Sequence, residues 1–441
     1  MRTSGDLAGA RSAPYGSPAG AVKYASMRAS ILLLALTSAL FLAPALRAQT
    51  PDPPADRARD PLFLGYGTQP EMDFSGRTVM SLQSLVSRAI GSIGHVEERH
   101  SGLAPAREFP VAAALLLLQH EVGGHGGRAR EFGLSPSYAF RFDLSAATGT
   151  ARPPRTNEEG TLLAAGGAEA DGVMSHRVML DLLRPEGADG AKIPLAFMSK
   201  LDLSVYVASA KRPGPGLVNQ FRDGNDVAYY LFSRQAEERG SDPATVWDNT
   251  YEPIPEDPAL DYNRRAARAA ALWNLLDPSL AGAMVNYFRQ HVLGGEARVH
   301  APVLRAGAGV GLTVGTRAAL GPQEVSRYLD LYAATRRGVF TAYVRDLDSP
   351  LNRTYGGGLG VYGLRLGPGL ELGLAADAWK EPDSIKSLHT GTGWNATGEL
   401  DARLGDRWGL AAKVGSKSDG FIPGLPISDG VYFGLGAQAR F

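Results

Sequence analysis

Residues 111–125 read Val-Ala-Ala-Ala-Leu-Leu-Leu-Leu-Gln-His-Glu-Val-Gly-Gly-His, an apolar run that ends in two histidines with a glutamate between them. The run predicts a helix, and two imidazoles beside a carboxylate are groups that a zinc ion takes. In a regular α-helix, positions i and i+5 diverge by roughly 140°, so His120 and His125 would point apart. A π-bulge brings such a pair together, and Gly123-Gly124 tolerates that distortion. We therefore expect a widened turn here.

The two histidines and the glutamate have separate expected roles. His120 and His125 would bind Zn²⁺, which lowers the pKa of its bound water to about 7, and Glu121 would be the catalytic general base. The alternative is a buried helix that stops at Gly123-Gly124 and carries two incidental histidines. Because the chain has 8 histidines in 441 residues, this arrangement favours a metal site.

The motif resembles that of a known family. Zinc peptidases of the dipeptidyl peptidase III type carry H-E-x-x-G-H, which His120, Glu121, Gly124 and His125 match. The resemblance covers these six residues and implies that the histidines bind zinc and that Glu121 is the catalytic glutamate. The family takes its third ligand from a helix with the pattern E-E-x-R-A-D. Residues 166–171, Gly-Gly-Ala-Glu-Ala-Asp, agree with it only in the Ala-Asp ending, which also looks like the Glu-Ala-Asp stretch of other zinc metallopeptidases.

A second predicted helix supplies the candidates for the third ligand. It begins with a capping box at Thr156 and Glu159 and continues to about residue 183. Glu169 stands in its middle among glycines and alanines, which allow close approach of two helices, and a buried carboxylate there is costly unless it is paired or metal-bound. We assign Glu169 as the third ligand and Asp171 as a residue that orients a histidine from the outer shell. His176, on the same face, is the alternative ligand or a core histidine.

Two arginines follow the motif, at positions 128 and 130. Arg128 and Arg130 could stabilise an oxyanion or bind a carboxylate of the substrate. The alternative is that both are surface arginines at a helix end.

The first residues have the pattern of a targeting segment. Residues 27–48 combine a charged start, a short apolar core and a small-residue exit, which is typical of a secretory signal peptide. Residues 1–26 then indicate a start codon assigned too early, and residues 49–60 a polar linker. The apolar core is too short to span a bilayer.

The amino-acid composition limits the possible metal ligands and partners. The chain has no cysteine, so only His, Asp and Glu remain as metal ligands, and a secreted chain without disulfides fits a bacterial envelope. With 45 basic and 45 acidic residues, the zero net charge gives no electrostatic basis for a nucleic-acid partner.

After about residue 300 the period of the pattern changes from 3.6 to 2, which predicts strands. Before that point, helical patterns dominate, including residues 194–209, residues 263–276 and a helix that starts at Asp277-Pro278. The expected strands are residues 306–318, 326–335, 338–347, 355–366, 369–379, 393–404, 407–416 and 430–441.

The connections between these strands alternate between tight turns and long loops, as in an up-and-down barrel. Eight strands of about ten residues with apolar residues on one face are typical of an outer-membrane barrel, and the terminal Phe441 resembles the end of such proteins. The outer membrane lipid is then a partner. The alternative is a soluble sandwich or barrel, in which the apolar face would be the interior.

Together these patterns predict an α+β multidomain protein, with a helical metal-binding domain at residues 61–297 and an antiparallel β-barrel of about eight strands at residues 298–441. We expect a zinc-dependent hydrolase of the bacterial cell envelope, most simply a peptidase, whose substrate is a peptide or another amide or ester. Its helical domain would face the periplasm beneath an outer-membrane barrel. The alternative is a non-catalytic outer-membrane barrel protein with a structural or vestigial metal site.

Overall fold

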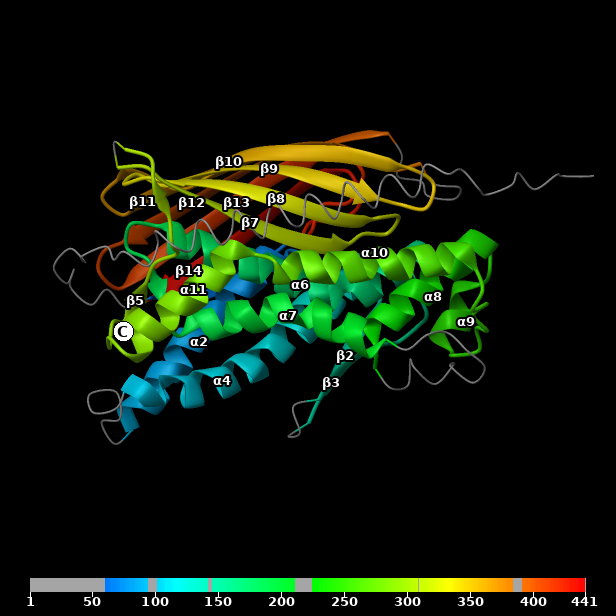
Figure 1. Ribbon diagram of the computed structural model, residues 1–441, viewed down its shortest axis with the longest axis horizontal. Helices are drawn as coiled ribbons and strands as arrows, with labels where there is room; N and C mark the ends of the chain where they lie inside the picture. Colours follow the sequence, from blue (N-terminus) through cyan, green and yellow to red (C-terminus); the bar gives the residue numbers. More distant parts are fainter. Residues whose placement is uncertain are drawn as a thin grey trace, which may run out of the picture. The chain divides into compact units, whose positions relative to one another are not determined.

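The computed structural model describes residues 60–93, 101–141, 145–210, 224–307, 309–383 and 391–440. The expected signal peptide, nearly all of the expected linker and the terminal Phe441 lie outside these residues. Residues 49–441 group into one unit, in which helices cover one side of a large antiparallel sheet (Figure 1). The α+β class is confirmed.

The predicted strands are present in the C-terminal part. Each of the eight long strands overlaps the range expected for it, and each pairs with the next along the chain. Their bounds are β7 (Gly311–Leu320), β8 (Val325–Ala334), β9 (Val339–Asp348), β10 (Arg353–Gly367), β11 (Leu370–Lys380), β12 (Thr392–Leu404), β13 (Trp408–Lys417) and β14 (Gly430–Ala439).

The sheet is not the closed barrel that we expected from residues 298–441. β1 (Leu62–Gly67) pairs with β14, so the sheet has ten strands in the order β1-β14-β13-β12-β11-β10-β9-β8-β7-β6, where β6 is Leu304–Arg305. Among the described residues, β1 and β6 are its two ends and do not pair with each other. The closed-barrel prediction was wrong because β1, from the region assigned to the helical domain, occupies the backbone groups of β14 that closure would require.

The helices come mainly from the first two thirds of the chain. The longer ones are α2 (Met72–Ser92), α4 (Ala104–Leu118), α6 (Asn157–Leu183), α7 (Lys192–Ser209), α8 (Asp226–Arg239), α10 (Pro258–Leu275) and α11 (Pro278–Asn286). The shorter segments are η2 (Ser101–Leu103), η3 (Gln119–His125), α5 (Gly126–Glu131), α9 (Pro243–Trp247) and η5 (Tyr287–Val292), with small two-stranded sheets of β2 (Pro136–Phe140) with β3 (Ala146–Thr150) and of β4 (Ala188–Asp189) with β5 (Arg298–Val299). Of the helices in the described part of the chain, none is both long and apolar enough to cross a membrane.

Two predicted helix starts are confirmed. The side chain of Thr156 accepts a hydrogen bond of 3.1 Å from the backbone N–H of Glu159 at the start of α6. Asp277 accepts from the backbone N–H of Ser279 at 3.0 Å, and Pro278 occupies the first position of α11, where it forgoes no helical hydrogen bond.

α6 is the helix around which the others pack. It contacts α2, η3, α7 and α8, and its Met174 and Val178 are fully buried in a core that includes Ile193 of α7. Burial of each side chain of this size stabilises the fold by about 1.5–3 kcal/mol. The packing fixes α6 and α7 against η3, which carries the histidine motif.

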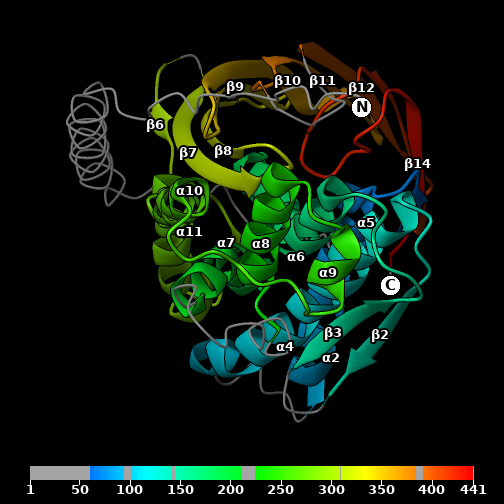
Figure 2. The same ribbon diagram turned by 90° about the vertical axis from the view of Figure 1, so that its right-hand side faces the viewer.

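The sheet curves around the helices (Figure 2), and charged side chains on its concave side pair with helix residues. On this concave side, Glu399 of β12 pairs with Arg77 of α2 at 2.6 Å and with Arg177 of α6 at 2.9 Å, and Lys413 of β13 pairs with Glu71 at 2.6 Å. Such buried charges are tolerated because each has a partner of opposite sign.

The convex side of the sheet carries the apolar residues. Val431, Phe433 and Leu435 of β14 are exposed, whereas Tyr432 between them is buried against the concave side. The predicted alternation is therefore present with its apolar face outward. In the described residues this face does not form the interior of a sandwich or barrel.

Candidate metal centre

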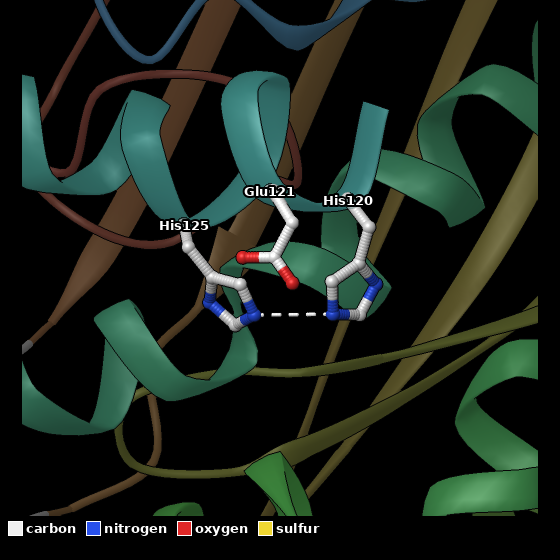
Figure 3. Close-up of side chains that lie close together, drawn as sticks. All are labelled: His120, Glu121 and His125. Carbon is white, nitrogen blue, oxygen red and sulfur yellow. Dashed lines mark hydrogen bonds between the residues drawn. The ribbon is translucent and has the colours of Figure 1, made fainter. Parts of the chain in front are cut away.

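The two histidines of the motif lie on one turn of a π-helix. At Gln119 the helix α4 passes into η3, whose hydrogen bonds join residues five apart and so place His120 and His125 on one face. Their Nε2 atoms are 3.1 Å apart, and Figure 3 shows the rings converging with the carboxylate of Glu121 beside them. The predicted widening of the turn is confirmed.

Close approach of η3 to α6 explains the glycines on both elements. A Cβ atom added to Gly124 would lie 2.4 Å from the backbone oxygen of Gly166, which is far inside van der Waals contact. The expectation that small residues let the two helices meet closely is confirmed. It places α6 directly beneath the histidine pair.

A carboxylate from a third element completes the cluster. Asp226, the first residue of α8, has its Oδ2 atom 2.9 Å from Nε2 of His120 and 3.1 Å from Nε2 of His125. Asn225 caps α8 by accepting from the backbone N–H of Ala228 at 2.9 Å, which fixes the start of the helix and with it the position of Asp226. Both histidines are buried, whereas the Asp226 side chain is 24% exposed.

These three atoms fit a divalent metal ion. They form a triangle with sides of 2.9, 3.1 and 3.1 Å. These separations are compatible with three ligands of one ion, since zinc's usual bonds to nitrogen and oxygen are about 2.0–2.2 Å long. Three ligands leave one tetrahedral position for water or substrate. The group His120, Glu121 and His125 could also hold a metal ion, as could His120, Asp171 and Asp202.

Hydrogen bonds behind the rings orient both histidines. Nδ1 of His120 lies 3.0 Å from Asp171 and 3.3 Å from Asp202, and Nδ1 of His125 lies 2.6 Å from the backbone oxygen of Leu163. A carbonyl oxygen only accepts, so Nδ1 of His125 carries a proton, and in the neutral form of the ring Nε2 is the atom available to a metal ion. The structure thus brings Asp171 to the position expected of an orienting residue.

The electrostatics of the cluster favour positive charge at its centre. Burial disfavours the charged form of His120. The charge of Asp202 and the hydrogen bonds with Asp171, Asp202 and Asp226 together have the larger effect, so the pKa of His120 is raised well above its usual value. Burial likewise opposes the charge of Asp226, yet the two histidines hold the pKa of Asp226 well below its usual range. Burial raises the pKa of Asp171 to about 8. A divalent ion would supply the positive charge that these groups favour.

Glu121 is held beside His120 and His125. Its side chain is buried, and the hydroxyl of Thr148 in β3 donates to its Oε2 atom at 2.6 Å. The same hydroxyl is 3.1 Å from the backbone oxygen of Glu121. The β2–β3 hairpin therefore fixes the carboxylate next to the cluster, in a position suited to a general base.

Tyr206 of α7 lies on the other side of the cluster. Its ring stacks on His120 with centroids 5.4 Å apart and an interplanar angle of 14°, and its hydroxyl is 3.4 Å from Nε2 of His120. Burial and the nearby charge of Asp226 raise the pKa of Tyr206 above its usual value, so the hydroxyl keeps its proton and remains a donor.

The structure does not bring Glu169 to the histidines. Its Oε2 atom accepts from Nε of Arg128 at 2.9 Å, its Oε1 accepts a second hydrogen bond from the same guanidinium, and the backbone N–H of Gly424 donates to Oε1 at 2.7 Å. The argument that this buried carboxylate needs a partner is correct, but the partner is Arg128. This pair also removes Arg128 from the candidate oxyanion donors, and its full burial excludes a surface arginine.

Arg130 and His176 also lie away from the cluster. Arg130 donates to the Tyr138 hydroxyl at 2.5 Å, to Gln69 at 3.0 Å and to the backbone oxygen of Val122 at 2.9 Å. Because Val122 belongs to η3, these hydrogen bonds stabilise that helix. Nδ1 of His176 lies 3.2 Å from the hydroxyl of Tyr332, and burial lowers the pKa of His176 to about 3. His176 is thus a neutral, partly buried histidine outside the cluster.

Sequence reasoning missed Asp226, Asp202, Tyr206 and Thr148. Asp202 and Tyr206 stand four residues apart on a helix that was predicted, so their shared face was available as a signal. The sequence signal for Asp226 is weaker: it is an acidic residue directly after Asn225, a residue type that caps helices. Nothing local indicates that either helix faces the histidine motif.

The comparisons with known proteins add no relative: neither a family model nor a curated protein nor a solved structure matches the chain. The assignment of a metal centre therefore depends on the geometry of these residues alone.

Proposed function

We propose that this protein is a metal-dependent hydrolase that uses zinc and cleaves an amide or ester bond, with peptides as the first substrate class to test. The observation that carries the proposal is the convergence of His120, His125 and Asp226 beside a buried, oriented glutamate. A site that only staples helices together needs neither an open coordination position nor a base next to it. The signal-peptide pattern of residues 27–48 and the absence of cysteine support the bacterial cell envelope as the location of the protein.

His120, His125 and Asp226 would hold the ion. When bound, zinc would polarise the scissile carbonyl and acidify a water molecule. Asp171 and the backbone of Leu163 keep both imidazoles in the tautomer that presents Nε2 to the centre. Because these outer partners are fixed by α6, the ligand set is preorganised by packing.

Glu121 would take the proton of the attacking water and pass it to the leaving group. The hydrogen bond from Thr148 holds its carboxylate beside the two histidines, with one oxygen within 4.8 Å of a ring nitrogen of each. A positioned general base contributes about 10²–10⁴-fold to a rate.

Tyr206 would donate a hydrogen bond to the oxygen that becomes negative as the carbonyl is attacked. Its hydroxyl lies on the same side of His120 as Asp226, both being within 3.4 Å of the His120 Nε2 atom. A donor aimed at a developing oxyanion acts in the transition state more than in the ground state.

Glu121→Gln tests the proposal. We expect the variant to bind zinc with the stoichiometry of the wild-type protein and to lose turnover of a mixed peptide and ester library by about 10²–10⁴-fold. Metal content is measured by elemental analysis, with His120→Ala as the control that loses the ion. Wild-type protein that binds zinc but cleaves nothing in the library would favour the structural metal site, and undiminished cleavage by the glutamine variant would exclude Glu121 as the base.

A further inference from the structure

The convex face of the ten-stranded sheet is a second feature that the hydrolase proposal does not use. We define the outer face as the outward residues of β8 to β14 and β1. Large apolar side chains are exposed all over it, among them Leu359 (70%), Val414 (57%), Val431 (71%) and Leu435 (62%). An exposed apolar area that extends over many strands marks a surface with a partner, because monomeric proteins in water rarely expose one.

The middle of the outer face is free of charge. Outward positions along the centres of β9 to β14 carry Leu, Val, Phe, Ala or Gly, as in β13, where Leu410, Ala412 and Val414 alternate with inward residues. Charged outward residues lie at the strand ends, where Arg353 and Arg327 pair with Asp346. The result is an apolar band with a polar rim.

The polar and apolar faces of this sheet are arranged differently from those of a sheet that packs on helices and is covered by water. Its inward side chains include Arg345, Asp377 and Glu399, and their partners lie within the protein: Arg345 donates to the backbone oxygen of Phe421 at 2.7 Å, and Asp377 accepts from Tyr343 at 2.6 Å. A sheet that faces helices on one side and water on the other would place its apolar residues toward the helices. This sheet buries some apolar residues against the helices, such as Val325 and Val339, but it also exposes many large apolar side chains on the side away from them.

Helix side chains form hydrogen bonds with several backbone groups on the open edges of the sheet. At β1, the hydroxyl of Ser81 accepts from the N–H of Phe63 at 3.0 Å and donates to its carbonyl at 3.2 Å, and Thr78 accepts from Gly65 at 3.3 Å. At β7, Lys200 of α7 donates to the backbone oxygen of Thr316. Backbone N–H and C=O groups without hydrogen-bond partners are too costly to place in hydrocarbon. The edge groups named here have partners, so at these positions the edge is compatible with hydrocarbon.

From these observations we infer that the outer face contacts the hydrocarbon of a lipid bilayer. Strands of ten residues or more suffice for a hydrocarbon layer when they are tilted. A second copy of the chain fits poorly, because two rigid convex faces touch only along a line, whereas acyl chains follow the curvature shown in Figure 2. The inference is independent of any catalytic activity.

Vesicle binding tests it. The full chain is mixed with phosphatidylcholine vesicles, and its partitioning is measured by flotation and by quenching of tryptophan fluorescence with brominated acyl chains, since Trp394 and Trp408 are exposed on the outer face. We expect Leu359→Glu and Val414→Glu each to lower the partition coefficient by roughly tenfold or more. Leu293→Glu is the matched control, because Leu293 is an equally apolar residue, 79% exposed, next to η5 on the helical side. It should bind like the wild-type protein.

Three results would overturn the inference. One is a monomer that does not float with vesicles. Another is a dimer in solution that Leu359→Glu dissociates, which would show a second copy on this face. The third is equal loss of binding in Leu293→Glu. Circular dichroism of each variant verifies folding, and two separate positions on the face guard against a local effect of either substitution.

Discussion

Gly167 of α6 lies against the imidazole of His120 so closely that a Cβ atom at Gly167 would be 2.2 Å from Nε2 of His120. The ring therefore occupies the space that any other residue at position 167 would fill. The glycine on one helix sets the position of the ligand on another.

Gly167→Ala should displace the His120 ring and weaken zinc binding by more than about tenfold, since outer-shell changes at metal sites cost about 10–100-fold. Isothermal titration with zinc measures this. Gly172→Ala is the matched control in the same helix, because its added Cβ meets nothing within 4 Å. It should leave zinc affinity unchanged and stabilise the fold by about 0.4–1 kcal/mol.

Asp226→Ala should lower zinc affinity by more than Asp171→Asn does, because Asp226 faces the Nε2 atoms and Asp171 acts through Nδ1 of His120. For Asp171→Asn we expect a loss of about 10–100-fold. Competition with a chelator of known affinity gives both values. An Asp226→Ala protein with wild-type affinity would exclude Asp226 as a ligand and favour the group of His120, Glu121 and His125.

Glu169→Gln should leave the zinc content intact and destabilise the fold by about 3 kcal/mol, because it leaves the buried guanidinium of Arg128 short of charge compensation. Urea unfolding gives the free energy, and elemental analysis gives the metal content. Loss of zinc from a folded Glu169→Gln protein would restore Glu169 as a ligand.

Tyr206→Phe should keep the metal and the fold while kcat falls by about 10²-fold, with KM little changed, because the hydroxyl would act on the transition state. Steady-state kinetics on the best substrate of the library separates the two constants. If KM rises and kcat does not fall, Tyr206 binds substrate instead of stabilising the oxyanion.

The pH dependence of stability should carry a contribution from Glu158. Burial and the charges of Glu237, Glu324 and Glu381 raise the pKa of Glu158 to about 8. An unfolded glutamate titrates near about 4.3, so between these values the folded state holds a proton that the unfolded state has lost, and the free energy of unfolding falls as pH rises.

Glu158→Gln should remove this contribution, so the free energy of unfolding of the variant should rise relative to that of the wild-type protein between pH 5 and pH 8, by on the order of 3 kcal/mol. Urea unfolding at the two pH values measures the gain. Glu256→Gln, at an exposed loop residue, is the control and should show none. An equal pH slope in the Glu158→Gln and wild-type proteins would refute the assignment.

The sequence alone determined the features that depend on local geometry. The five-residue spacing of His120 and His125 converges only in a π-helix, and Gly123-Gly124 permits one, so the motif and its distortion were both predictable. The strands from β7 to β14 followed from a period of two, and so did the division of their residues between two faces.

Only the tertiary structure decided which segments meet. A strand's backbone groups are alike along any chain, so nothing in β14 specified that β1 would take its edge and leave the sheet open. In the same way, Glu169 was correctly expected to need a partner, but whether that partner is a metal ion or Arg128 depends on how α6 sits against α5. Asp226 stands about a hundred residues from the histidines, and only the packing of α8 on α6 places it beside them.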